Sequence, residues 1–155
     1  MYDALTVARY VINYSNCQDY VISNLKLQKI LYFIQAYFLI IRDKACFSDA
    51  IEAWDFGPVV PSVYQEFKQY GAGNIPAIRQ YTEGYGYNAE SKLFDSKIIS
   101  RDDKKSVECV VEKFKDYSAT DLVKLTHAQD PWKDAYRPYE NNIISLESIR
   151  NYFNE

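Results

Sequence analysis

Only three cysteines and one histidine occur in the 155 residues, and their scarcity excludes several classes of site. Cys17, Cys46 and Cys109 are too few and too far apart for a disulfide framework or for the paired ligands of a zinc site. This usage favours a reducing compartment. Because His127 is the only histidine, any nucleophile–base pair would have to combine it with a residue remote in the sequence.

The sequence also lacks a nucleotide-binding loop and a metal-binding pattern. The glycine pairs at 71–73 and 84–86 lack the lysine and the serine or threonine of a phosphate-binding loop. Asp49, Glu52 and Asp55 recur at every third position, but without a histidine or an ion-binding loop they are more typical of a solvated acidic strip. We therefore expect no metal ion and no cofactor.

The chain has neither an excess of positive charge nor a long apolar run. Its formal net charge is −3 and its basic residues are scattered, which argues against nucleic acid as the principal partner. The most apolar stretch, 25–41, contains four polar residues that a membrane span would not accommodate: Lys26, Gln28, Lys29 and Gln35. Residues 1–10 lack the basic start and apolar run of a secretory signal. These features predict a cytoplasmic protein without a membrane partner.

What the sequence does contain is the composition of one globular domain. Hydrophobic residues make up 48% and charged residues 25%, and no repeat, low-complexity tract or linker divides the chain. We expect a single domain over 1–155. Its predicted fold is mainly α: a compact multi-helix domain around a buried central helix, with a small β-hairpin or extended segment as an addition.

The central helix is predicted by the strongest periodic signal, which begins at Asn24 as its N-cap. The apolar positions on one helix face are Leu27, Ile30, Leu31, Ile34, Phe38 and Ile41. Apolar residues also occupy the other faces, so this helix should be buried over most of its circumference.

Further helices are expected over 4–14, from Pro61 to the glycines at 71–73, over 100–114 and over 118–127. Ser118 and Asp121 have the spacing of a capping box at the start of the last of these. A short helix should begin at Asp130, acting as its cap, and Pro131. A last helix should follow Ser145 and turn Leu146, Ile149 and Phe153 toward the core. Residues 47–60 are expected to form an extended piece that turns at Gly57-Pro58, and 74–96 an irregular excursion or a loose hairpin.

Tyrosine is the compositional exception, with 15 residues. Tyrosine combines a large contact area with a polar tip and is enriched at protein interfaces. Ordinary half-buried packing explains the same composition, so both interpretations stay open at this point.

Three elements of the sequence resemble, in the same order, those of the Panacea domain. Residues 25–33, which include Gln28 and Lys29, resemble its "LQKLLYF" helix. Residues 51–61 with Tyr64 resemble the "AW.yGPVvp.vy" signature, and residues 125–132 resemble the "LTH...PW" element. Together these elements span most of the domain, which chance matches would rarely do. The corresponding residues are Gln28, Lys29, Trp54, Asp55, Gly57, Pro58, Val59, Tyr64, His127, Pro131 and Trp132.

The resemblance implies a mainly helical domain of bacteria and phages, found in SocA-like antitoxins and GepA-type phage-associated proteins. Such a domain neutralises a cognate protein toxin, which is expected to be encoded by an adjacent gene. An alternative that the family also suggests is an adaptor that delivers its partner to an ATP-dependent protease. Because family members bind unlike toxins, the signature residues are expected to build the scaffold more often than to touch the toxin.

The residues themselves leave one alternative of another class open, which is a hydrolase that combines Cys46 or Cys109 with His127. No local motif supports this pair, and a lone histidine at a helix end is more often bonded to backbone or to a carboxylate. We therefore expect a binding protein without catalytic residues. A homodimer is compatible with the sequence.

Overall fold

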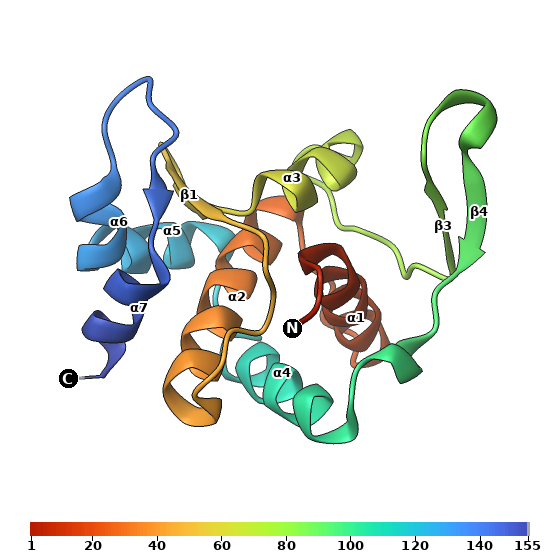
Figure 1. Ribbon diagram of the computed structural model, residues 1–155, viewed down its shortest axis with the longest axis horizontal. Helices are drawn as coiled ribbons and strands as arrows, with labels where there is room; N and C mark the ends of the chain where they lie inside the picture. The colour runs from red at the N-terminus through yellow and green to blue at the C-terminus, as the bar shows by residue number, and fades with distance from the viewer. Residues whose placement is uncertain (155) are drawn as a thin grey trace.

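The computed structural model describes residues 1–154, and these form a mainly helical domain, as predicted (Figure 1). The α-helices are α1 (Ala4–Cys17), α2 (Asn24–Tyr37), α3 (Pro61–Phe67), α4 (Arg101–Lys113), α5 (Ala119–His127), α6 (Asp130–Ala135) and α7 (Leu146–Phe153). Short helical turns are η1 (Phe38–Arg42, a π-helix), η2 (Lys68–Tyr70), η3 (Gly86–Asn88) and η4 (Ser96–Ile98). Within 1–154, no helix is long and apolar enough to span a bilayer.

Helix α2 is the central pillar, which confirms the main expectation from the sequence. It packs against α1, α3, α4, α5 and α7 and against strand β2 (Gly57–Val59), and Figure 1 shows it in the middle of the molecule. Leu27, Leu31 and Ile34 on this helix are completely buried. Because such burial contributes about 1.5–3 kcal/mol for each large apolar side chain, α2 organises the hydrophobic core.

The polar residues of α2 are buried as well, and they bind the chain that crosses the helix. The Gln35 amide accepts a hydrogen bond from the Cys46 backbone N–H at 2.7 Å and donates one to the Phe47 carbonyl at 2.9 Å. Lys26 donates from its Nζ to the Lys115 carbonyl at 3.1 Å. The two bonds of Gln35 satisfy backbone groups that would otherwise be buried without a partner.

Two details of the predicted α2 are wrong. Ser23, whose backbone is extended, is the N-cap and accepts a bond from the Lys26 N–H, so Asn24 is the first helical residue. Ile41 is 61% exposed although its spacing placed it on the core face. The reason is η1, because a π-turn adds a residue to the turn and shifts the following side chains around the helix axis.

The later helices also depart from the prediction at their ends. Gln129, not Asp130, is the N-cap of α6, and it makes no capping bond with its side chain. In α7, Ile149 is buried and Phe153 packs against the core, but Leu146 is 41% exposed. The cap of α5 is as predicted, because Ser118 and Asp121 exchange the two hydrogen bonds of a capping box.

The extended segment near Gly57 is a β-hairpin in a three-stranded antiparallel sheet. Strands β1 (Ile51–Trp54), β2 and β5 (Ile143–Ile144) follow the order β2-β1-β5. Glu52 pairs with Val59 in β2 and with Ile143 in β5. Strand β5 was not predicted from the sequence, and it fastens the C-terminal part of the chain to the hairpin.

The uncertain region 74–96 contains a second hairpin, formed by β3 (Gln80–Glu83) and β4 (Glu90–Leu93), that projects from the body of the molecule (Figure 1). Its base is held by Arg9, whose guanidinium carbon lies 3.6 Å from the centre of the Tyr81 ring. Asn13 adds two hydrogen bonds to the Ile78 backbone. Of the two alternatives, the hairpin is therefore confirmed.

Three tyrosines, on α1 and on the loop that follows it, bond to carboxylates of α4. Tyr10 donates to Glu108, while Tyr14 and Tyr20 both donate to Glu112. The hydrogen bond to Glu112, together with burial, raises the pKa of Tyr14 to about 12. For these residues, intramolecular packing is the correct explanation of the tyrosine content.

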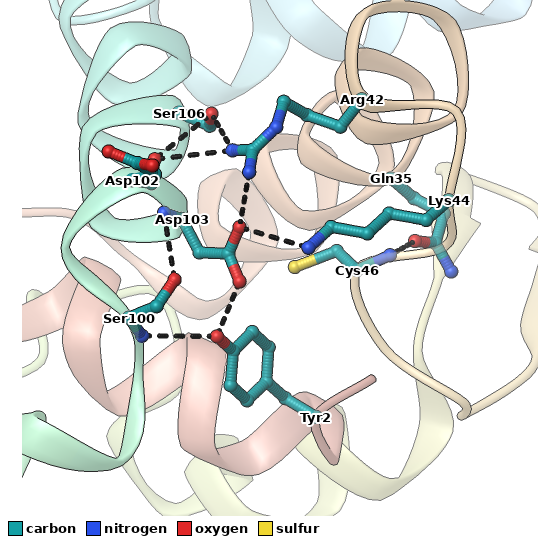
Figure 2. A network of polar contacts seen from close by, with 9 residues as sticks. All are labelled: Tyr2, Gln35, Arg42, Lys44, Cys46, Ser100, Asp102, Asp103 and Ser106. Atoms are coloured by element: carbon teal, nitrogen blue, oxygen red, sulfur yellow. Dashed lines mark hydrogen bonds and ion pairs between the residues drawn. The ribbon is translucent and has the colours of Figure 1, made fainter.

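The buried carboxylate of Asp103 links the N-terminal end of α4 to the first residues of the chain (Figure 2). Asp103 is 4% exposed and lies 3.1 Å from Arg42 and 3.3 Å from Lys44, and it accepts the Tyr2 hydroxyl at 2.5 Å. Burial alone would raise the pKa of Asp103, but these hydrogen bonds outweigh it and hold the pKa below its ordinary value. The cluster therefore links the first residues, η1 and α4.

The contrast between Ile34 and Ile41 tests the position of the core. An Ile34→Asp variant should lose about 3 kcal/mol or more in unfolding free energy, because it buries an unpaired charge. Ile41→Asp, on the same continuous helix but 61% exposed, should change it by about 1 kcal/mol or less. Urea unfolding followed by circular dichroism measures both, and equal losses would contradict this assignment of the core.

Candidate functional site at the β1–β2 turn

The residues that carry the family resemblance come together around the turn between β1 and β2. Trp54, Asp55, Gly57, Pro58 and Val59 form the turn and its flanks. The others approach it from separate helices: Gln28 and Lys29 from α2, Tyr64 from α3, His127 from the end of α5, and Pro131 and Trp132 from α6. Pro131 is buried in the first turn of α6 and helps to begin that helix.

The inner side of the turn is held by two buried side chains of α2. Gln28 is 1% exposed and accepts the Val60 N–H at 2.9 Å, while its own amide donates to Asn24 at 2.9 Å. Lys29 is completely buried and donates from Nζ to the Pro58 carbonyl at 2.9 Å. Neighbouring residues of one helix thus hold β2 and the residue that follows it.

The outer side is held by three stacked rings. His127, Trp132 and Tyr136 lie with successive ring centres 4.0 and 4.5 Å apart. His127 Nε2 lies 2.9 Å from the Asp55 carbonyl, and Trp132 donates from Nε1 to the Trp54 carbonyl at 2.7 Å. The expectation that His127 is bonded to backbone is confirmed.

Tyr136 completes this stack and donates to the Asp55 carboxylate at 2.5 Å. Sequence reasoning did not include Tyr136 in the site. Its spacing of four residues from Trp132 places both rings on one helical face, and this signal was present in the sequence.

Gly57 allows α2 and α5 to approach the β1–β2 turn closely. Its φ of +109° is rarely adopted by residues with a side chain. A Cβ atom there would lie 2.7 Å from Cε of Lys29 and 2.9 Å from the hydroxyl oxygen of Thr126. Glycine is therefore required both by the backbone conformation and by the close approach of α2 and α5.

The three carboxylates of the expected acidic strip are accessible to solvent, since Asp49 and Glu52 are partly buried and Asp55 is exposed, but each also has a structural partner. Asp49 accepts bonds from the Ala4 N–H and the Ser62 hydroxyl. Glu52 accepts the indole N–H of Trp54, and Asp55 accepts the Tyr136 hydroxyl. Within 1–154, no three His, Cys, Asp or Glu side chains gather in a way that could hold a metal ion.

The groups considered for nucleophilic chemistry lie in separate surroundings. Cys46 is buried, and burial, together with the nearby Asp103, raises the pKa of its thiol to about 12. Cys109 is exposed on α4. In the described part of the chain, no hydrogen bond joins either cysteine to His127, whose Nε2 faces the Asp55 carbonyl.

A hollow of about 350 Å³ opens on the solvent side of the turn. It is lined by the signature residues Gln28, Trp54, Asp55, Val59 and Tyr64, among others. Its rim carries Phe56, which is 66% exposed, and Tyr139, which is fully exposed. Neither rim residue was anticipated from the sequence. The site therefore combines a rigid, hydrogen-bonded interior with exposed aromatic side chains.

Comparison with known proteins gives two matches in agreement with this site. The family model described as Antitoxin SocA-like, Panacea domain, matches residues 27–133, which include the turn and both sets of side chains that hold it. Antitoxin SocA of Caulobacter vibrioides (strain NA1000 / CB15N) is 33% identical over 133 residues, which cover 84% of this chain and 68% of that protein. No solved structure matches the chain.

Substitution of Gly57 tests the close approach at the turn. Gly57→Ala should lower the unfolding free energy by about 2–4 kcal/mol, because it adds steric overlap to an unfavourable backbone conformation. Gly71→Ala is the matched control, since Gly71 also has a positive φ but has nothing within 4 Å of the place where its methyl group would lie. Its loss should be smaller, about 1–2 kcal/mol, because only the backbone conformation is unfavourable there. Equal losses in urea unfolding would contradict the steric argument.

The buried lysine makes stability depend on pH. Burial lowers the pKa of Lys29 to about 7, against an ordinary value near 10.5, so the unfolded chain binds more protons between these values. The unfolding free energy should therefore rise with pH from about 7, by at most roughly 1.4 kcal/mol per pH unit. Lys29→Met should remove this contribution, while contributions from the other titratable groups stay.

The quantity to measure is the difference in unfolding free energy between the wild type and Lys29→Met at several pH values from neutral to mildly alkaline. This difference should move in favour of the wild type as the pH rises. If the two curves run parallel, Lys29 does not lose its proton in the folded protein.

Proposed function

Because the chain belongs to the SocA-like antitoxin family with the Panacea domain, we propose that it binds a cognate protein toxin and neutralises it by direct contact. It acts in the cytoplasm as a single domain over 1–155, and the toxin is encoded by an adjacent gene. Neutralisation consists of covering a surface of the toxin and needs no chemical step.

The observation that carries this proposal is how the signature side chains are used. Gln28, Lys29, His127 and Trp132 each form a hydrogen bond with a backbone group of the β1–β2 hairpin or its flanks. These bonds hold the hairpin in shape, so the outer surface can vary without loss of the scaffold. A family whose shared residues build a scaffold is suited to binding unlike partners.

The state of the thiols also supports binding over catalysis. A nucleophilic cysteine needs a lowered pKa and a base within hydrogen-bond reach. The Cys46 thiol has a raised pKa, and the ring of His127 bonds the Asp55 carbonyl. We therefore propose that the protein is not an enzyme.

Co-expression with neighbouring genes tests the proposed function. Each neighbouring open reading frame is expressed with and without this protein, and growth is scored. One neighbour should arrest growth alone, and co-expression should restore growth. The two proteins should then co-purify as a complex. If no neighbour is toxic, or if toxicity is unaffected, the antitoxin proposal fails.

Two further arms separate the alternatives. In a strain without the relevant ATP-dependent proteases, protection should persist, whereas an adaptor that delivers the toxin for degradation would lose it. His127→Gln should keep most of the protection, because its amide can still donate to the Asp55 carbonyl. Loss of protection in a folded His127→Gln protein, matched by loss in Cys46→Ser or Cys109→Ser, would instead favour the hydrolase.

A further inference from the structure

An apolar groove of about 430 Å³ lies apart from the β1–β2 turn, between α2, η1, α4, α5 and α7. Its floor is a stack of Phe33 and Phe114, whose ring centres are 4.4 Å apart. Its walls include Ile41, Tyr117 and Leu125, which are 61%, 41% and 37% exposed. None of the eleven signature residues lines it. This surface is therefore available for contacts that the scaffold does not use.

The irregular turn η1 creates one wall of the groove. In a regular continuation of α2, Ile41 would follow the buried stripe of Ile34 and Phe38. The π-turn over Phe38–Arg42 instead places Ile41 at the groove. Such single π-turns cost backbone regularity and occur frequently at functional sites.

The shape of the groove favours a helix over a small molecule. Small-molecule sites usually enclose most of their ligand, whereas four of the residues that line this groove are more than a third exposed. A second hollow, of about 420 Å³, adjoins the groove at Tyr117 and Leu125, but the rest of its lining is charged and consists of Asp116, Asp121 and Lys124. The apolar groove itself is open and lies between helices, which is the usual receptor for the apolar face of an amphipathic helix.

The charge at the edge of the groove indicates which residues should flank the apolar face of the bound helix. Among the residues that the structure describes, Lys113 is the only charged one in the lining. Its ammonium lies 5.7 Å from the centre of the Phe114 ring and, within 1–154, forms no ion pair. A carboxylate on the bound helix would therefore find an available cation at the edge of the groove.

From these observations we propose that the groove is the toxin-binding surface, and that it receives an amphipathic helix of the toxin whose acidic flank faces Lys113. The proposal rests on the proposed function for the identity of the partner. The groove itself, and the chemistry of the helix it accepts, rest on the structure alone.

The first experiment uses a defined probe, so that it does not depend on a known toxin. A fluorescently labelled amphipathic peptide carries leucine at the i, i+3, i+4 and i+7 positions and glutamate on the flank. A second peptide has lysine in place of each glutamate. Anisotropy should show that the wild-type protein binds the glutamate peptide more tightly, and Lys113→Glu should reverse this preference.

Matched variants locate the binding. Ile41→Asp should weaken binding of the glutamate peptide by about tenfold or more, because it places a carboxylate in the apolar wall. Ile98→Asp is the control: Ile98 is 63% exposed, close to the 61% of Ile41, but lies in η4 outside the groove. It should bind as the wild type does. Circular dichroism confirms that both variants fold.

Each outcome decides the proposal. Equal binding by Ile41→Asp and Ile98→Asp, no binding of the glutamate peptide, or indifference to the charge of the flank overturns it.

Once co-expression has identified a toxin that the wild type neutralises, the Ile41→Asp variant should no longer protect cells against it, and the Ile98→Asp variant should still do so. If the wild type protects and Ile41→Asp protects equally, the groove is not the toxin-binding surface and the antitoxin function stands. If the wild type protects against no neighbour, the antitoxin function fails, toxin binding at the groove fails with it, and the peptide still decides whether the groove accepts such a helix.

Discussion

The fold depends on buried polar side chains of α2 that hydrogen-bond to the backbone of the chain crossing it. Gln28, Lys29 and Gln35 bind backbone groups between Cys46 and Val60, where water has no access. A buried backbone group without a partner costs about 1–3 kcal/mol, so each of these side chains fixes the position of the segment that it binds. The lysine is the most demanding of them, because its burial lowers its pKa to about 7. An apolar residue could fill the same space but could not hold the Pro58 carbonyl.

The stacked rings at the ends of α5 and α6 complete this arrangement from the other side. Because His127 and Trp132 bond adjacent carbonyls of the hairpin, the backbone of the turn is held from two directions. Rigid presentation lowers the entropy that a binding surface loses when a partner docks. The ring of His127, the single histidine of the sequence, therefore helps to hold the hairpin. We propose that in this family member the signature residues serve the scaffold, and that contact with a partner is left to surfaces such as the apolar groove.

Tyrosine has two distinct uses in the molecule. It joins α1 and the loop that follows it to α4, since Tyr14 of α1 and Tyr20 of the loop both bond to the Glu112 carboxylate. At the projecting hairpin and near the β1–β2 turn it is exposed, as at Tyr85, Tyr87 and Tyr139. Composition alone could not separate these uses, because a tyrosine that reaches a carboxylate on another helix and one that faces solvent have the same local sequence preferences.

The sequence by itself determined the mainly helical fold, the central helix, the capping box of α5 and the turn at Gly57, because periodicity, caps and glycine act over a few neighbouring residues. It also indicated the family, through residues that later proved to lie around one hairpin. Only the tertiary structure decided that Lys29 and Gln28 are buried, that Tyr136 joins the stack, that β5 pairs with β1, and that η1 turns Ile41 out of the core. Each of these depends on groups far apart in the chain, since a buried polar side chain is acceptable only where a distant backbone group completes its hydrogen bond.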